Sequence, residues 1–417
     1  MSSIDSGGDE MNSNSVLVIN CGSSSIKYQL LQPQSGQIWI AGEVERIGIA
    51  DTLWRHEQAD VDKQIIPAVG IVDHRSALEL INQLIIKALA KNRKLPLADN
   101  LLAIAHRVVH GGEYFTSATQ IDERVKARIR ELIPLAPMHN SVNLLGIEVA
   151  ETFFPGVVQV AVFDTAFHQS LPEYAFRYAL PEAVYSEFNL RRYGFHGTSH
   201  AYVLRKTAEY FEQRPETLNV ISIHLGNGAS MAAIKNGRCI DTTMGFTPLE
   251  GLMMGTRCGD MDPSIAIFLV QNSKKNPAEI LKMLNEQSGL KGICGYTDMR
   301  DVKQQADAGD ASAVLARQMF CYRIKKYIGA YRAVLGRVDA IVFTGGIGEH
   351  DQEVRQQSCE GLEELGIVLD QAQQADQVNT DQAVMALDDS LQSKIQVLLI
   401  PANEEWEIAM QALISLK

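Results

Sequence analysis

The sequence has no long hydrophobic run and no excess of basic residues. The best candidate for a membrane span, residues 144–163, is interrupted by Glu148 and Glu151, and no window reaches the roughly 18 uncharged apolar residues of a spanning helix. The chain carries 38 Lys and Arg against 50 Asp and Glu, a formal charge of −12. Because nucleic acids are bound through clustered cations, we do not expect a nucleic-acid partner. Because no apolar run is long enough, we do not expect a membrane span.

Closely spaced cysteines are also absent. The nearest two of the six cysteines, Cys239 and Cys258, are nineteen positions apart, and no CxxC pair occurs. This spacing argues against a zinc site or a disulfide framework and favours reduced thiols in a cytoplasmic protein. Residues 1–14 are polar and lack the basic and apolar blocks of a secretory signal, so we expect a flexible tail there.

The sequence does contain a regular alternation of short apolar runs and amphipathic helices. Its 417 residues, 46% of them hydrophobic, suit two or three packed domains. The pattern predicts strands within 16–19, 101–105, 157–163, 220–224, 340–343 and 397–400, and helices within 76–90, 201–211, 278–287 and 311–335. An α/β fold follows.

One pattern occurs twice, about two hundred residues apart. VLVINCGSSSIK at 16–27 and NVISIHLGNGASM at 219–231 both run from an apolar strand through a Gly-containing polar turn into a second strand. Two such hairpins predict a duplicated domain with a cleft between the halves. Two unrelated β-turns would give the same pattern, and the residues alone leave both interpretations open.

Several segments carry groups that bind phosphate. In the first hairpin, Gly22 permits close backbone approach, Ser23 and Ser25 offer hydroxyls, and Lys27 offers a cation, although no Walker A motif is present. The second hairpin, 224–230, could enclose phosphates in the same way. TGGIGEH at 344–350 follows a predicted strand, which suits nucleotide contact. Each of these segments could equally be a plain turn.

Charged side chains at strand ends and in glycine-framed loops are candidates for the chemistry. Arg107 in HRVVHGG and Arg257 in MMGTRCG could present a planar guanidinium to a carboxylate or phosphoryl group, although surface ion pairing is the alternative. Asp164 ends an apolar run, where α/β proteins place ligand-facing groups, and could equally cap a turn. Glu404 starts the last helix and could help to hold Mg²⁺, with Glu405 as its natural control.

Two histidines lie four residues apart in FHGTSH. No Glu follows His196, so the metalloprotease motif HExxH is missing, and Gly197 is expected to weaken any helix there. We interpret His196 as a donor to a transferred group and His200 as a structural hydrogen-bonding residue.

Taken in order, these segments closely resemble the acetate kinase family, which includes propionate kinases. The matching stretches are VINCGSSSIK, HRVVHGG, PLAPMHN, FDTAFH, RYGFHGTSH, HLGNGAS, TTMGFTPLEGLMMGTRCGDMDP, DMR, FTGGIGEH and PANEE, and they cover the chain from about residue 15. The resemblance implies duplicated actin-like (ribonuclease H-like) ATPase domains with an interdomain cleft. The first would span 15–165, completed by a helix at about 401–417, and the second, 166–400, would carry the nucleotide site and a homodimer interface.

The resemblance also implies the activity, which is Mg²⁺-dependent phosphoryl transfer from ATP to acetate, giving acetyl phosphate and ADP, with Mn²⁺ as a substitute metal. It assigns catalytic roles to Asp164, His196 and Arg257, and metal binding to Asn20 and Glu404. Acetate would contact Arg107, Val109, Met138, Phe195 and Pro248. The nucleotide and its phosphates would contact Ser23, Ser25, Lys27, His224, Leu225, Gly226, Asn227, Gly228, Asp298, Met299, Arg300, Gly346, Ile347, Gly348, Glu349 and His350.

The chain departs from the family pattern at His350, where relatives commonly have Asn, and at Ser141, where Pro is frequent. A carboxylate with a pKa near ~4–5 is ionised at neutral pH, so direct in-line transfer needs no base, and Asp164 is expected to orient rather than to abstract a proton. The β-branched Val109 is expected to crowd acids longer than acetate, leaving propionate a weaker substrate. A propionate kinase and an actin-like or chaperone-type ATPase are the alternatives.

Overall fold

The computed structural model describes residues 15–22, 24–48, 52–58, 61–66, 68–91, 101–370, 384–388 and 392–417. The expected tail at 1–14 and the predicted phosphate ligand Ser23 lie outside these residues. The chain divides into two compact units, Met1–Ala166 with Glu404–Lys417, and Phe167–Asn403, and each is described by itself.

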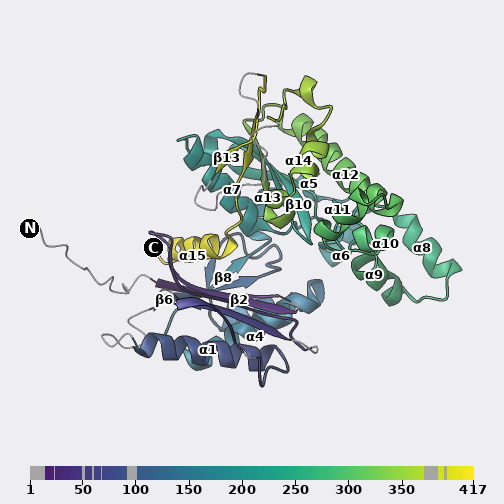
Figure 1. Ribbon diagram of the computed structural model, residues 1–417. Coiled ribbons are helices and arrows are strands. Elements are labelled where there is room, and N and C mark those ends of the chain that lie inside the picture. The colour runs from purple at the N-terminus through teal and green to yellow at the C-terminus, as the bar shows by residue number, and fades with distance from the viewer. Residues whose placement is uncertain are drawn as a thin grey trace, which may run out of the picture. The chain divides into compact units, whose positions relative to one another are not determined.

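The first unit is built on one sheet in the strand order β5-β4-β3-β2-β1-β6-β8-β7 (Figure 1). Its strands are β1 (Ser15–Cys21), β2 (Ser25–Gln32), β3 (Gln37–Glu45), β4 (Leu53–Gln58), β5 (Val61–Ile66), β6 (Leu101–Val108), β7 (Thr119–Gln120) and β8 (Gln159–Phe163). Its helices are α1 (His74–Lys91), α3 (Glu123–Glu131), η1 (Ile133–Leu135), α4 (Pro137–Phe153) and α15 (Glu404–Ser415).

Helices cover both faces of this sheet, which explains why β1 is buried along its whole length. Successive residues of a strand point to opposite faces. Leu17 and Ile19 therefore pack with residues of α1 and α4 on one face, while Val16 and Val18 pack with residues of α15 on the other. Figure 1 shows α1 and α4 below the sheet and α15 above it.

The second unit has a sheet in the order β11-β10-β9-β12-β14-β13. Its strands are β9 (Asn219–Leu225), β10 (Ala229–Lys235), β11 (Arg238–Thr242), β12 (Ala340–Thr344), β13 (Met385–Ala386) and β14 (Gln396–Leu399). Its helices are η2 (Ala166–Ser170, which starts at the last residue of the first unit), α5 (Glu173–Phe176), α6 (Glu182–Phe188), α7 (Gly197–Tyr210), η3 (Pro215–Thr217), α8 (Pro263–Asn272), α9 (Pro277–Glu286), α10 (Gly289–Cys294), α11 (Met299–Asp307), α12 (Ala311–Leu335), α13 (Gly345–His350), α14 (Gln352–Cys359) and η4 (Glu363–Leu365).

The two sheets repeat one topology. In the first, β1 pairs antiparallel with β2 and parallel with β6, and β6 pairs parallel with β8. In the second, β9 pairs antiparallel with β10 and parallel with β12, and β12 pairs parallel with β14. The two hairpins that resemble each other in sequence, β1-β2 and β9-β10, occupy the same place in the two sheets. The predicted α/β class and the internal duplication are therefore confirmed.

In each half of the sequence, the helix that follows the last parallel strand packs on the sheet of the other half. The long helix that follows β8, α7, packs on β9 and β12 of the second sheet, whereas α15, which follows β14, packs on β1, β6 and β8 of the first. The C-terminal helix thus belongs to the first unit.

The expectation that Gly197 weakens a local helix is wrong, because α7 begins at this residue. Glycine costs most in the interior of a helix, and at its first turn the loss is small. The preceding residue, His196, is the N-cap and has a φ of 58°. Residues Gly197–His200 are buried, so packing stabilises this first turn.

None of the helices in the described residues is long and apolar enough to span a bilayer.

Candidate active-site residues

Three polar side chains meet at one edge of the first sheet, where the adjacent parallel strands β1, β6 and β8 end. Arg107 Nε donates to Asp164 Oδ1 at 2.9 Å, a second guanidinium nitrogen contacts Asp164 Oδ2, and Arg107 Nη1 donates to Asn20 Oδ1 at 3.2 Å. Burial alone would lower the pKa of Arg107, but the charge of Asp164 raises it above its usual value. The predicted strand-end residues thus form one connected cluster.

The start of α15 adds negative charge to this cluster. The pKa of Glu404 is raised to about 7, mainly by burial and also by the charges of Asp164 and Glu405, against the opposing effect of Arg107. Asn20 Nδ2 donates to Glu405 Oε1 at 3.4 Å, so the natural control residue also contacts the cluster. Three carboxylates therefore lie around one arginine, and the site has an excess of negative charge.

The β1-β2 hairpin turns tightly beside this cluster. Gly22 N donates to the carbonyl oxygen of Ser25 at 2.8 Å, and a Cβ at Gly22 would lie 3.0 Å from Ser25 Oγ. The ring of His74, at the start of α1, lies with Nε2 3.0 Å from the Gly22 carbonyl oxygen. Lys27 is half exposed, and its ammonium lies 3.7 Å from Glu43.

Two buried asparagines on α4 hold the loop after Arg107. Val109 N donates to Asn143 Oδ1 at 3.0 Å, and Asn143 Nδ2 donates to the Cys21 carbonyl oxygen at 2.8 Å. Asn140 exchanges two hydrogen bonds with the backbone of His110. Sequence reasoning missed both asparagines, although a pair of amides spaced i, i+3 on an apolar helix is a recognisable signal.

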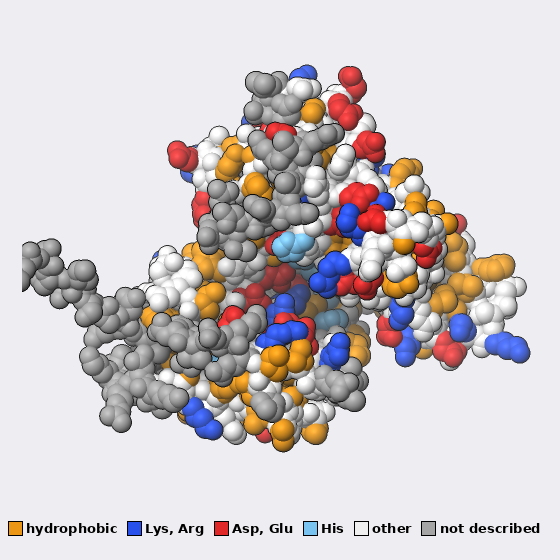
Figure 2. Space-filling model, in the orientation of Figure 1, with side chains coloured by type: hydrophobic (Ala, Val, Ile, Leu, Met, Phe, Trp, Pro, Cys, Tyr) orange, Lys and Arg blue, Asp and Glu red, His pale blue; other side chains and the backbone are white. Residues whose placement is uncertain are grey.

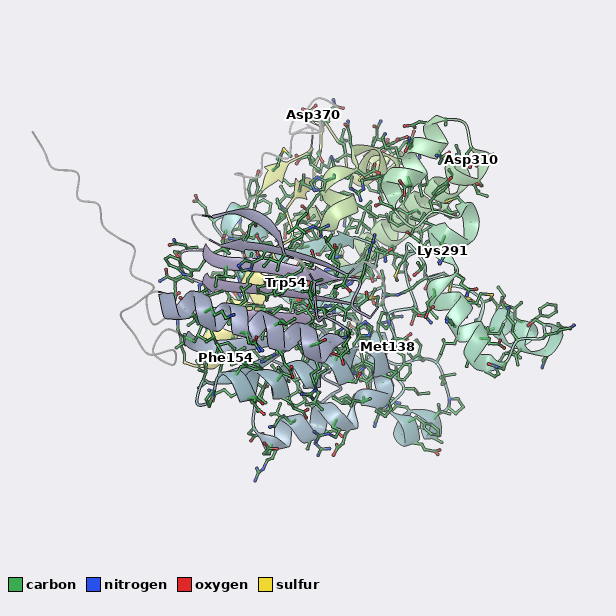
Figure 3. All side chains as sticks on the ribbon, turned by 60° about the horizontal axis from the view of Figure 1, so that its bottom comes forward. Trp54, Met138, Phe154, Lys291, Asp310 and Asp370 are labelled. Carbon is green, nitrogen blue, oxygen red and sulfur yellow. The ribbon has the colours of Figure 1, made fainter. Side chains whose placement is uncertain are left out.

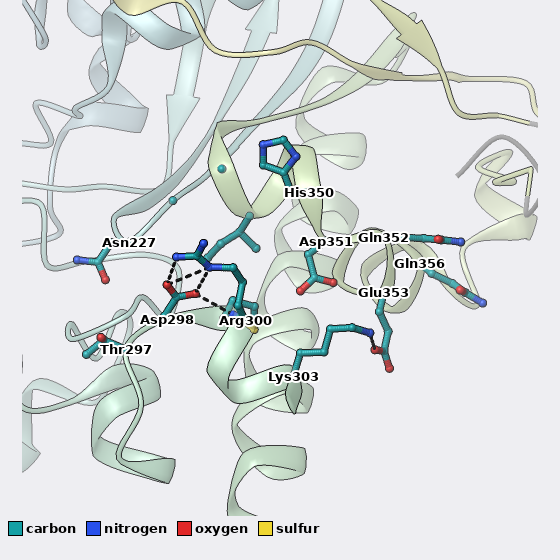
Figure 4. Close-up of a pocket in the computed structure, with 14 residues that line it drawn as sticks. Asn227, Thr297, Asp298, Arg300, Lys303, His350, Asp351, Gln352, Glu353 and Gln356 are labelled. Carbon is teal, nitrogen blue, oxygen red and sulfur yellow. Dashed lines mark hydrogen bonds and ion pairs between the residues drawn. The ribbon is translucent and has the colours of Figure 1, made fainter. Parts of the chain in front are cut away.

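In the second unit, three predicted nucleotide segments line one cavity of about 620 Å³ (Figure 4). These are the turn of the β9-β10 hairpin, the start of α11 and the start of α13. The predicted residues that line the cavity are Gly226, Asn227, Asp298, Met299, Arg300, Gly346, Ile347 and His350. The structure therefore brings together segments that are more than a hundred residues apart in the sequence.

The other predicted nucleotide residues of this unit lie beside the cavity without lining it. His224 Nδ1 lies 2.8 Å from Ser199 Oγ, and Glu349 Oε1 accepts from Ala402 N at 2.9 Å. Leu225 and Gly348 are buried, and Gly228 belongs to the same hairpin turn as Gly226.

Sequence reasoning also missed one wall of the cavity, which is formed by Thr297, Lys303, Asp351, Gln352, Glu353 and Gln356. Gln352 and Gln356 are spaced i, i+4 on α14, directly after the glycine-rich segment, and this spacing was an available signal. Within the cavity Arg300 folds back on Asp298, with Nε 3.0 Å from Oδ1, and Lys303 pairs with Glu353 at 3.1 Å (Figure 4).

His196 and Arg257 meet over the same hairpin turn. A Cβ built on Gly228 would lie 3.5 Å from Arg257 Nη1 and 3.5 Å from His196 Nε2, so both side chains lie directly against this turn. Arg257 Nη1 donates to the carbonyl oxygen of Pro248 at 3.3 Å and to Met254 Sδ at 3.6 Å. No acidic side chain among the described residues pairs with this partly buried cation, and burial lowers its pKa. An anion would supply the missing partner.

Two carboxylates hold the irregular segment that carries Arg257. Glu250 accepts from Arg192 Nη2 at 2.6 Å and from Tyr178, while Arg192 Nη1 donates to three carbonyl oxygens at 242–244. Asp260 accepts from Gly251 N at 2.8 Å and from Tyr327 Oη at 2.7 Å. A long segment without regular secondary structure is therefore held in place by charged hydrogen bonds.

The predicted acetate pocket is divided between the units. Val109 is buried and Met138 is 65% exposed at the start of α4 in the first unit (Figure 3). Phe195 is buried in the second unit, which also contains Pro248. Likewise Arg107 belongs to the first unit and Arg257 to the second, so the predicted convergence of these residues stays a prediction.

Two sheets of one topology, an arginine-carboxylate cluster at the strand ends of the first, and a cavity at the hairpin of the second define a protein of the duplicated actin-like class. The model of the acetokinase family matches residues 15–410, and the chain belongs to this family.

Relatives of known name are similar over nearly the whole chain. The acetate kinase of Oleidesulfovibrio alaskensis is 50% identical over 408 residues, 96% of this chain and 99% of the relative. The crystal structure of Porphyromonas gingivalis acetate kinase has a TM-score of 0.88 at 40% identity and covers 97% of this chain and 100% of its own. A propionate kinase from Francisella tularensis has a TM-score of 0.86 at 37% identity, covering 95% and 98%.

Proposed function

We propose that this protein reversibly transfers the γ-phosphoryl group of ATP to acetate, giving acetyl phosphate and ADP. The observation that carries the proposal is the meeting of Arg257, a partly buried cation without an acidic partner in the described part of the chain, with His196 over Gly228. Both adjoin the turn whose residues Gly226 and Asn227 line the large cavity. The family membership supplies the substrate class.

The cavity of the second unit would hold the nucleotide. Its volume of about 620 Å³ is within the range of small-molecule sites. The exposed backbone of the Gly226–Gly228 turn would approach the phosphates, and the walls formed by α11 and α14 would hold the nucleoside. The γ-phosphoryl group would then lie near Arg257 and His196, which would stabilise the charge on its equatorial oxygens.

Acetate would bind to Arg107, whose guanidinium is held by Asp164 and Asn20. Because acetate is ionised at neutral pH, its oxygen can attack the phosphorus in line without a base. Both oxygens of Asp164 accept hydrogen bonds from Arg107, which suits an orienting role better than proton abstraction. Val109, Met138, Phe195 and Pro248 would limit the length of the acid.

A divalent cation, Mg²⁺ or Mn²⁺, fits the residues present. Mg²⁺ prefers oxygen ligands from one or two carboxylates and substrate phosphates, and Asn20 and Glu404 supply such oxygens. The described residues contain no group of three or more His, Cys, Asp and Glu arranged to hold a metal alone. Burial and the neighbouring carboxylates raise the pKa of Glu404, and a bound cation would favour its charged form. When bound, the cation would neutralise phosphate charge.

We also propose a homodimer in the cytoplasm. Ile265, Ile267 and Phe268 of α8 are 47%, 59% and 61% exposed, and Figure 2 shows hydrophobic side chains gathered over this part of the second unit. Such a patch is typical of a protein interface. Sedimentation equilibrium of the purified chain tests the dimer, and a Phe268→Ser variant that is as dimeric as the wild type would argue against this face.

The activity is tested by ADP release in a coupled assay with ATP, Mg²⁺ and acids of two to four carbons. We expect ADP release that depends on acetate and on Mg²⁺, with propionate used less efficiently. ADP release that is independent of any carboxylate would instead support an actin-like or chaperone-type ATPase.

The similarity to a propionate kinase favours one further candidate, a propionate-preferring kinase. Comparing kcat/KM for acetate and propionate separates the two. We expect acetate to have the higher value, because the β-branched Val109 is buried in the loop that follows Arg107.

A further inference from the structure

A continuous chain of hydrogen bonds runs behind His196 in the second unit. His196 Nδ1 lies 2.9 Å from Ser230 Oγ, Ser230 Oγ lies 2.9 Å from His200 Nε2, and His200 Nδ1 lies 2.8 Å from Ser222 Oγ. Ser222 and Ser230 come from the adjacent strands β9 and β10, and both histidines come from the start of α7. The chain therefore connects the sheet interior to the side chain that faces the proposed phosphoryl group.

The inner members of this chain are excluded from water. Ser222, Ser230 and His200 each have 0% exposure. Burial, helped by the nearby His168 and His224, holds the pKa of His200 well below its usual value, so its ring is neutral and carries one proton. Each serine hydroxyl also has one proton. Every link can consequently be donated from one side only. Ser230 Oγ could accept from both rings, but its own buried hydroxyl proton would then have no acceptor in this network, so the favoured arrangements run in one direction throughout.

Two directions are possible. If Ser222 donates to His200, then His200 Nε2–H donates to Ser230, and Ser230 donates to His196 Nδ1. His196 then keeps its single proton on Nε2. In the opposite direction His196 would carry its proton on Nδ1 and donate it to Ser230, and Ser222 would accept the last hydrogen bond.

The Ser222 end decides between them. In the described part of the chain, Ser222 Oγ has no other hydrogen-bond partner than His200. If the hydrogen bonds were donated toward Ser222, the hydroxyl proton of Ser222 would be buried without an acceptor, which costs the desolvation of a donor. If the hydrogen bonds are donated away from Ser222, every donor in the series has an acceptor. A second proton on His196 would force the unfavourable direction, so the same argument keeps His196 neutral.

We propose that Ser222, His200 and Ser230 are positioning residues that hold His196 as the neutral tautomer protonated on Nε2. This nitrogen and Arg257 Nη1 both lie next to Gly228, each 3.5 Å from a Cβ built there. In the proposed phosphoryl transfer, which this last step assumes, Nε2–H donates a hydrogen bond to an equatorial oxygen of the migrating group and no proton is lost. The tautomer itself does not depend on the proposed activity.

The tautomer is measured on the full-length chain labelled with ¹⁵N-histidine, by two-bond ¹H–¹⁵N correlation near pH 7.5. A His196→Gln variant identifies the His196 signals. We expect the pattern of an Nε2-protonated ring in the wild type. An Nδ1-protonated or doubly protonated His196 would overturn the proposal, whatever the enzyme's activity.

Variants test the direction of the chain. Ser230→Ala removes the hydroxyl that links the two rings, and we expect His196 to become a mixture of tautomers. Ser222→Ala, which does not touch His196, is expected to shift the tautomer in the same sense by a smaller amount. Ser199→Ala is the matched control, because this buried hydroxyl on α7 contacts His224 and lies outside the chain. An unchanged His196 tautomer in both Ser222→Ala and Ser230→Ala would contradict the proposal.

Kinetics give a second readout. For Ser230→Ala we expect kcat to fall by about 10- to 100-fold, with KM for ATP and acetate changed by less than about threefold, because the loss concerns orientation rather than binding. A rise in KM without a fall in kcat would overturn the positioning role. If the wild type shows no acetate-dependent ADP release, the proposed function is wrong, but the tautomer measurement still decides this inference.

Discussion

Arg107 donates hydrogen bonds to both carboxylate oxygens of Asp164, across the neighbouring parallel strands β6 and β8. Asp164 is 1% exposed as a side chain and Arg107 is 18% exposed, so the pair is largely removed from water. Such a pair orients the guanidinium, because Asp164 accepts from one edge through Nε and Nη2 while Asn20 accepts from Nη1. Asp164 therefore contributes to the structure, by orienting Arg107, as well as to the proposed chemistry.

We therefore expect Asp164→Asn to reduce both stability and activity. The substitution replaces two charge-assisted hydrogen bonds of a largely buried pair by weaker ones, and the free energy of unfolding should fall by about 2 kcal/mol. KM for acetate should rise, since the guanidinium loses its fixed orientation. Urea unfolding and steady-state kinetics measure the two effects. Unchanged stability with a complete loss of turnover would instead indicate a base.

The segment that carries Arg257 gives a second prediction. Tyr327 Oη donates to Asp260 Oδ2 at 2.7 Å, and Asp260 in turn accepts from Gly251 N. Tyr327→Phe removes one hydrogen bond to a charged group, so we expect a loss of about 2 kcal/mol in the free energy of unfolding. Tyr322→Phe, at an exposed position of the same helix, is the matched control and should leave stability unchanged.

The local parts of this fold were predictable from the sequence. The helix expected at 311–335 matches α12 residue for residue, because Asp310 accepts hydrogen bonds from its first turn and Gly336 ends it with a positive φ of 73°. The duplicated hairpins were equally visible. The prediction that Gly197 weakens a helix was wrong, because the sequence does not show that the first turn of α7, after His196, is stabilised by packing.

Local sequence patterns could not predict which side chains distant in the sequence pair with each other. Arg107 and Asp164 were both selected as candidates, but fifty-seven positions separate them, and nothing in either motif identifies the other as its partner. The same holds for Glu250 and Asp260, which lie in the motif at 242–263 although nothing there identifies them as the residues that hold the Arg257 segment. The α14 wall of the cavity was missed because the i, i+4 spacing of Gln352 and Gln356, although visible, is also common on exposed helix faces.

Arg257 is the residue on which the proposed transfer depends most. We expect Arg257→Ala to lower turnover by on the order of 10³–10⁵, as for arginines that stabilise transferring phosphoryl groups. Arg238→Ala, which removes an exposed arginine of the same unit, is the control. Both proteins should show the same far-ultraviolet circular dichroism. A folded Arg257→Ala protein that keeps more than about a tenth of wild-type turnover is incompatible with this role.

Val109 is expected to set the preference between acids. Val109→Ala removes two methyl groups from a buried position in the loop after Arg107, and each methylene is worth about 1–3 kcal/mol of discrimination. The ratio of kcat/KM for propionate to that for acetate should rise by roughly tenfold. Val162→Ala makes the same change in the buried interior of β8 and should leave the ratio unaltered. A fall in the ratio for Val109→Ala would show that this side chain does not crowd the longer acid.

Buried histidines of the first unit predict acid sensitivity. His106 Nε2 lies 2.6 Å from Gln159 Oε1, and burial lowers the pKa of His106 to about 4. In the unfolded chain a histidine has a pKa near ~6.5, so between these values the unfolded state binds more protons, and stability falls as the pH decreases. We expect His106 to account for about 2 kcal/mol of the stability lost between pH 7 and pH 4.5. The measurement is urea unfolding of the wild type and His106→Gln at several pH values. The variant should start from a lower stability at pH 7 and lose less on acidification, whereas parallel curves for the two proteins would show that His106 does not titrate in this range.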